Sequence, residues 1–199
     1  GVRTRSWANG TARGVRAALP ASLRFASRTW HGPAGERLPA MVAAVALGRE
    51  LVGVHRTFLA EPGRKADVEP AKMMLGAVSG GAVRLSPWAT VLVVAEGIET
   101  ALSVLDALDG LRVCVWAALS TGGVSGLRLP PFADTVIVAA DGDEPGRRAG
   151  WDLLTRAAME RGWNGRVVAA PDGCDWNDHA GDAAAFADLR AVVEYFIDA

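Results

Sequence analysis

Acidic residues stand directly after two apolar runs in the middle of the chain. Residues 91–95 (VLVVA) are followed by Glu96, and residues 136–140 (VIVAA) are followed by Asp141 and Asp143. If both runs are strands of one parallel sheet, the three carboxylates meet at its carboxyl edge, where ligands bind in such folds. Carboxylate oxygens suit Mg²⁺, which completes its coordination shell with water and phosphate. The spacing therefore predicts a divalent-cation site.

Two further acids follow a later apolar run. Residues 166–170 lead into PDGCDWND, which contains Asp175 and Asp178. Each acid alone has an ordinary explanation, since Asp-Gly marks a turn and Asp143 can cap a helix. Their repetition on successive strand ends favours a metal site instead. The predicted metal ligands are Glu96, Asp141, Asp143, Asp175 and Asp178.

The elements that must position these acids alternate between strands and helices. Apolar runs typical of buried strands occupy residues 91–95, 113–119, 136–140 and 166–170. Helical periodicity falls between and after them, at residues 98–108, 143–161 and 183–197. This order predicts an α/β fold with a mostly parallel four-stranded sheet and helices on both faces.

The first half of the chain has a different pattern. Residues 40–47 and 51–59 flank Gly48 and predict a β-hairpin. Residues 23–30 predict a connector or short strand, residues 1–20 a short helix or an arm, and residues 60–81 a loop-rich stretch. We therefore expect a smaller α+β lobe before the parallel sheet.

Charge divides the chain at about the same place. Residues 1–90 carry 13 Lys and Arg against 5 Asp and Glu, a balance of +8, whereas residues 91–199 carry 8 against 17, a balance of −9. A basic lobe beside an acidic metal site is suited to holding phosphates of a nucleotide or nucleic acid. The candidate contacts in the first lobe are Arg56, Arg64, Lys65, Lys72 and Arg84. His55 or Arg56 could face a cleft, although a solvated strand face explains either residue equally well.

Composition restricts the class of protein. The longest apolar stretches are far shorter than the roughly 20 residues of a membrane helix. Two cysteines and three histidines offer neither a disulfide framework nor zinc-ligand spacing, which favours a reducing, cytoplasmic setting. No P-loop or GxGxxG fingerprint is present. The start at Gly1 suggests an excised domain or a processed terminus.

Four segments carry a resemblance to a known family. AEGIETALS, AALSTGG, AADGDEPGRRAG and PDGCDWNDHA resemble the Toprim domain, a Rossmann-like fold shared by DnaG-type primases, topoisomerases, OLD-type nucleases and RecR proteins. HRTFL and KMMLG look like the basic lobe that precedes Toprim in primases. The whole chain is similar to Toprim proteins of phages and integrative elements. The expected division is a basic lobe at 1–87 and a Toprim domain at 88–199.

The resemblance implies a role for individual residues. Glu96 matches the family glutamate, which acts in acid/base chemistry or holds a metal, and Asp141 and Asp143 match its DxD ligands. Lys72 looks like the primase lysine that faces the nucleotide, so the implied catalytic residues are Glu96, Asp141, Asp143 and Lys72. Arg147 and Arg148 stand at the family's GR position and join the expected nucleotide or nucleic-acid contacts. The chain departs from primases at Asn177 and Thr100, where they have acids; Glu99 precedes Thr100.

The implied activity is that of a primase, a DNA-directed RNA polymerase. It would use Mg²⁺ or Mn²⁺ to join NTPs into short primers on single-stranded DNA during replication, with a separate or fused helicase or zinc-finger domain as a partner. One alternative is an OLD-like nuclease, in which the same acids would act on water as the nucleophile. Another is a non-catalytic nucleic-acid-binding module. A topoisomerase is disfavoured, because the single Tyr195 is expected to pack in the core. Trp30, Trp88 and Trp176 are candidates to stack on bases.

Overall fold

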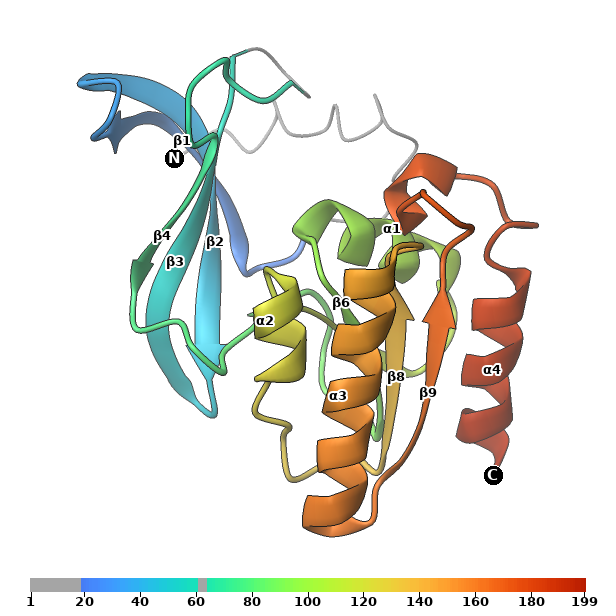
Figure 1. Ribbon diagram of the computed structural model, residues 1–199. Coiled ribbons are helices and arrows are strands. Elements are labelled where there is room, and N and C mark those ends of the chain that lie inside the picture. Colours follow the sequence, from blue (N-terminus) through green and yellow to red (C-terminus); the bar gives the residue numbers. More distant parts are fainter. Residues whose placement is uncertain (1–18, 61–63) are drawn as a thin grey trace.

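Two β-sheets form the framework of the computed structural model, which describes residues 19–60 and 64–199 (Figure 1). One sheet comes from the first part of the chain and is antiparallel. The other comes from the rest and is mostly parallel, with helices on both faces. The predicted fold class is therefore confirmed, while the prediction of a helix or arm at residues 1–20 falls mostly outside the described residues.

The first sheet has four strands in the order β1-β2-β3-β4. Their bounds are β1 Leu23–His31, β2 Glu36–Leu47, β3 Glu50–Phe58 and β4 Lys72–Gly76. The predicted hairpin is confirmed as β2 and β3, joined by a two-residue turn in which Gly48 has φ 57°. Such turns need a positive φ at a central residue, which glycine supplies without strain.

Strand β4 lies in the stretch that the sequence predicted to be loop-rich. It pairs antiparallel with β3, and Lys72 lies directly opposite Thr57. The segment KMMLG is short, begins with a lysine and ends with a glycine, so its own pattern is too weak to indicate a strand. The ladder with β3 decides its conformation, and this pairing fixes where Lys72 lies.

The second sheet has the order β5-β7-β6-β8-β9. The four parallel strands are β6 Val91–Ala95, β7 Val113–Ala117, β8 Thr135–Ala140 and β9 Asn164–Ala169, and β5 Val83–Arg84 pairs antiparallel with β7. The four predicted strands are confirmed. Three of them, β6, β7 and β8, are buried along their whole length, which explains why they read as continuous apolar runs. The fifth strand was not predicted, because two residues carry no periodic signal.

Helices cover both faces of this sheet (Figure 1). On one face α1 Ile98–Ala107 and α4 Ala187–Asp198 contribute to an apolar core with β6 and β7. On the other face α2 Thr121–Ser125 and α3 Glu144–Arg161 form a second core with β8. In the described part of the chain, no helix is both long enough and apolar enough to cross a membrane.

Two details of the helices differ from the prediction. Helix α4 begins at Ala187 rather than at residue 183, because the Asp182 side chain accepts a hydrogen bond from the N–H of Ala184 and holds a turn there. Tyr195 is 68% exposed rather than packed in the core, since α4 buries Leu189 and Val193 instead. Tyr195 belongs to the last turn of α4, whose C-terminal end lies at the opposite end of the sheet from the carboxyl ends of β8 and β9 (Figure 1).

The two lobes share a core. Leu23, Met41 and Val45 of the first sheet are buried together with residues of β6, β7 and α1. The Nη2 group of Arg84 in β5 also donates to the carbonyl of Gly48 in the β2–β3 turn. The boundary at residue 87 stays a prediction. Strand β5 lies before residue 87 and yet belongs to the second sheet.

Candidate active site

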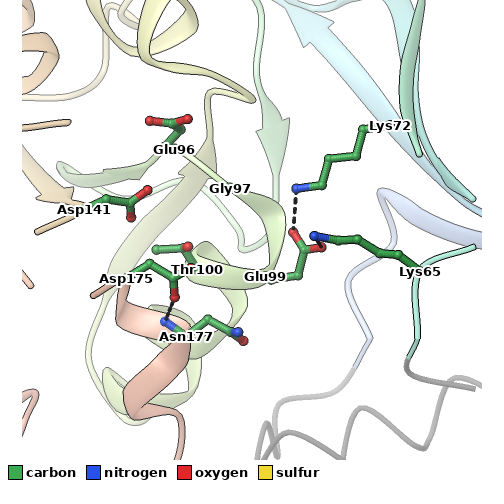
Figure 2. A pocket seen from close by; sticks show the side chains of 9 residues that line it. All are labelled: Lys65, Lys72, Glu96, Gly97, Glu99, Thr100, Asp141, Asp175 and Asn177. Atoms are coloured by element: carbon green, nitrogen blue, oxygen red, sulfur yellow. Dashed lines mark hydrogen bonds and ion pairs between the residues drawn. The ribbon is translucent and has the colours of Figure 1, made fainter. Parts of the chain in front are cut away.

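One pocket opens at the carboxyl edge of the parallel sheet and faces the first lobe. Glu96 and Asp141 follow β6 and β8 directly, and Asp175 follows the loop after β9. Figure 2 shows these acids on one side of the start of α1 and two lysines of the first lobe on the other. The pocket is lined by Lys65, Lys72, Glu96, Gly97, Glu99, Thr100, Asp141, Asp175 and Asn177.

Among these acids, Asp141 has the environment that most disfavours an ionised carboxylate. Its Oδ1 atom is buried and has no hydrogen-bond partner among the described residues. Burial, and then the negative charges of Glu96, Asp175, Asp143 and Asp178, raise its pKa from 3.8 to about 7. A carboxylate surrounded by other carboxylates fits a divalent cation, which would satisfy the lone oxygen and neutralise the group.

The pKa of Glu96 is raised by burial and then by the charge of Asp143, while Lys72 and the backbone N–H of Thr121, the first residue of α2, lower it. The STGG motif builds this contact: Ser120 caps α2 by accepting from the N–H of Gly123 at 2.9 Å. A Cβ on Gly123 would lie 1.9 Å from the carbonyl oxygen of Ala118, so the turn requires glycine. The motif thus positions the backbone N–H of Thr121, which lowers the pKa of the glutamate.

Two glycines bring Asp175 to Asp141. The N–H of Gly142 donates to the carbonyl of Cys174 at 2.8 Å, and the N–H of Gly173 donates to the carbonyl of Gly142 at 2.9 Å. A Cβ on Gly142 would lie 1.9 Å from the carbonyl oxygen of Pro171. The DGD and PDG segments therefore touch backbone to backbone, which sequence reasoning did not find.

Three of the five predicted metal ligands also cap helices. Asp143 accepts from the N–H of Gly146 at 2.8 Å at the start of α3. Asp175 and Asp178 form a reciprocal capping box on the short 3₁₀ helix Trp176–His179. Each of these caps uses one carboxylate oxygen and leaves the other available.

The predicted five-acid arrangement is not preassembled. Among residues 19–60 and 64–199, no three His, Cys, Asp or Glu side chains converge closely enough to hold an ion together. Asp143 and Asp178 also lie outside the lining of the pocket, which contains Glu96, Asp141 and Asp175. The metal assignment of the five acids stays a prediction.

The two lysines of the pocket both approach one acid. The Nζ atom of Lys72 lies 3.5 Å from Glu99 Oε2, and that of Lys65 lies 3.9 Å from Glu99 Oε1. Burial alone would raise the pKa of Glu99, but Lys72, a backbone hydrogen bond and Lys65 together hold it below its usual value. In the sequence, Glu99 stands out only as the neighbour of Thr100. The available signal was its spacing: Glu99 follows Glu96 by three residues, on the first turn of α1.

The predicted arginines lie outside this pocket. Arg56 donates to the carbonyl of Trp30 at 3.2 Å and lies over the Phe58 ring. Arg84 lies 4.7 Å from the centre of the Trp116 ring, in addition to its contact with Gly48. These contacts give both arginines a structural role.

The other predicted basic residues and the three candidate tryptophans differ in exposure. Arg147 pairs with Asp172 at 3.1 Å, and Arg64 and Arg148 are exposed. Trp30 and Trp88 are 50% and 70% exposed, so their rings can be reached from solvent. Trp176 is only 2% exposed and packs on Phe186, so the expectation that it stacks on bases is wrong.

Comparison with known families assigns the second lobe. Residues 91–185 match the family model described as the Toprim domain. The chain contains a Toprim domain. The residues before it, 9–85, match a model described as a domain of unknown function (DUF7146). No curated protein matches the sequence.

Solved structures extend the likeness to both lobes. The catalytic core of DnaG superposes with a TM-score of 0.63 at 17% identity over 96% of this chain and 73% of that one. The primase fragment of the bacteriophage T7 primase-helicase gives 0.54 at 15% identity, over 87% of this chain and 64% of the fragment. A DnaG primase catalytic domain bound to single-stranded DNA gives 0.53 at 18%, over 77% and 51%. The chain thus spans about half to three quarters of these relatives, and its Toprim domain and first lobe together have the fold of a primase catalytic core.

Proposed function

We propose that this protein is the catalytic core of a Toprim-type primase, which joins NTPs into short primers on single-stranded DNA. The observation that carries the proposal is the pocket, in which Glu96 and Asp141 of the Toprim domain face Lys65 and Lys72 of the first lobe. Nucleotidyl transfer uses both kinds of group, because carboxylates hold the metal cation and positively charged side chains neutralise the triphosphate.

The carboxylate oxygens at this sheet edge are of the donor type that Mg²⁺ and Mn²⁺ prefer. Glu96 and Asp141 would hold the cation, helped by the available oxygens of Asp143, Asp175 and Asp178. The unpartnered Oδ1 of Asp141 supports this assignment. When bound, the cation supplies charge that activates an attacking 3′-hydroxyl and neutralises the leaving pyrophosphate.

The protein's own residues bind and orient the substrates. Lys72, held by the β3–β4 ladder, would contact the triphosphate from the side opposite the acids. Lys65 would add a second positive charge from the loop before β4. The exposed Arg64 and Arg148 would guide the single-stranded template by phosphate contacts. A helicase, separate or fused, is the expected partner.

Primer synthesis on single-stranded DNA with NTPs and Mn²⁺ tests the proposal. Glu96→Gln and Asp141→Asn should each reduce primer yield by about 100-fold or more, since even a partner of a metal ligand is worth about 10–100-fold. Asp152→Asn, an exposed acid on α3, serves as the matched control and should leave the yield unchanged.

Other outcomes would overturn the proposal. Metal-dependent cleavage of DNA, lost in the same two variants, would make the protein an OLD-like nuclease. Binding of single-stranded DNA with neither synthesis nor cleavage would make it a non-catalytic module.

A further inference from the structure

Glu99 occupies the place where a phosphate would have to meet the two lysines of the pocket. It reaches from α1 of the Toprim domain to Lys65 and Lys72 of the first lobe (Figure 2). Each of its carboxylate oxygens lies near one ammonium group. Two ammonium groups that converge on one carboxylate are arranged as they would be around a bound phosphate.

The pocket lining carries more negative than positive formal charge. Its lining carries two positive groups, Lys65 and Lys72, and four acids: Glu96, Glu99, Asp141 and Asp175. This net formal charge of −2 weakens the binding of a polyphosphate. Glu99 has the greatest effect on the lysines, because it lies within 4 Å of both.

The sheet face next to Lys72 holds further polar groups without partners. Thr57 lies directly opposite Lys72 on the neighbouring strand, and His55 lies two residues earlier on the same face. Both are at least 96% buried, and Thr57 Oγ1 and His55 Nδ1 have no hydrogen-bond partner among the described residues. Burial, and then Lys72, lower the pKa of His55 to about 4, while Glu99 opposes the shift. The register thus sets Lys72 beside this buried polar face, while its Nζ atom lies 3.5 Å from Glu99 Oε2.

We propose that Glu99 is an internal competitor for the phosphate-binding lysines, and that a nucleoside triphosphate must displace its carboxylate to reach Lys65 and Lys72. The inference rests on the proposed function, since it assigns these lysines to the substrate polyphosphate. Glu99 then keeps both lysines paired until a polyphosphate displaces its carboxylate.

Binding of inorganic tripolyphosphate to the whole chain without divalent cations, measured by calorimetry at pH 8, tests this. Glu99→Gln should bind about three- to tenfold more tightly than the wild type, because two partly exposed ion pairs no longer compete. Glu160→Gln, which breaks the surface pair with Arg156, is the matched control and should bind like the wild type. The gain should disappear in Glu99→Gln/Lys72→Met.

The remaining outcomes separate this inference from the proposed function. If Glu99→Gln binds as the wild type or more weakly, while Lys72→Met abolishes binding, Glu99 does not compete and only this inference is lost. If no variant binds tripolyphosphate, with or without Mn²⁺, the lysines do not receive phosphate and both proposals fail. Glu99→Asp keeps the charge but shortens the side chain, so it should give an intermediate affinity and covers the case in which the glutamine variant does not fold.

Discussion

Replacement of Asp141 by asparagine should stabilise the metal-free protein, although it should destroy the proposed activity. The carboxyl of Asp141 is crowded by other acids, and its pKa of about 7 lies about three pH units above the ordinary 3.8. Since each unit corresponds to about 1.4 kcal/mol, the ionised group costs the fold at most about 4 kcal/mol at pH 8. Part of the side chain meets water, so we expect about 1–2 kcal/mol.

The sign and the pH dependence follow from the same numbers. A pKa raised by folding means that the cost is absent below the unfolded value near 4, grows with pH, and is complete above 7. At pH 5, between the unfolded and the folded pKa, only part of this cost is present. Asp141→Asn removes the charge and should therefore stabilise more at pH 8 than at pH 5.

Thermal unfolding in EDTA at the two pH values measures the effect. For a chain of this length, about 1–2 kcal/mol corresponds to an increase in Tm of about 2–8 °C at pH 8. Asp152→Asn should leave Tm unchanged, because this acid is exposed on α3. Added Mn²⁺ should raise the Tm of the wild type and not that of Asp141→Asn. An unchanged or lower Tm of Asp141→Asn at pH 8, or an equal gain at pH 5, would refute the electrostatic reasoning.

Three further predictions concern the site and its supports. Gly142→Ala should lower the free energy of unfolding in urea by about 2–4 kcal/mol, since its Cβ would lie 1.9 Å from the Pro171 carbonyl oxygen. The control Gly122→Ala, whose nearest neighbour would be Ser120 Oγ at 3.9 Å, should lower it by less than about 0.5 kcal/mol. Equal losses would contradict the close approach at Gly142. Arg84→Met should lower stability by about 1–2 kcal/mol through loss of its contacts with the Trp116 ring and the β2–β3 turn, and an unchanged midpoint would remove its structural role. Mn²⁺ affinity by calorimetry should fall by up to about tenfold per pH unit below pH 7, where the Asp141 carboxyl takes up a proton, and a flat profile from pH 8 to 6 would speak against that carboxyl as a ligand.

Local patterns predicted the elements and the end of each strand. Residues 91–95 and 136–140 read as buried strands because their neighbours cover both faces, and the acids that follow must then lie at one edge. The N-cap Asp143 and the left-handed Gly162 limit α3 where the sequence indicated. These features depend on residues close together in the chain, so periodicity and capping preferences reveal them.

Contacts between distant segments required the structure. Asp175 reaches Asp141 because the backbones at Gly142 and Cys174 pair across 32 residues, and β4 exists because β3 offers it a ladder. Lys72 looked like a substrate contact, but its present partner, Glu99, lies on another lobe.

The sequence alone determined that acids would gather at a sheet edge opposite a basic lobe. Apolar periodicity and charge composition are local properties, and they suffice for that conclusion. Only the tertiary structure decided which acidic side chain each lysine pairs with. An ion pair depends on the positions of two side chains that the chain order leaves independent, and packing of the two lobes on one shared core brings Glu99 to Lys65 and Lys72.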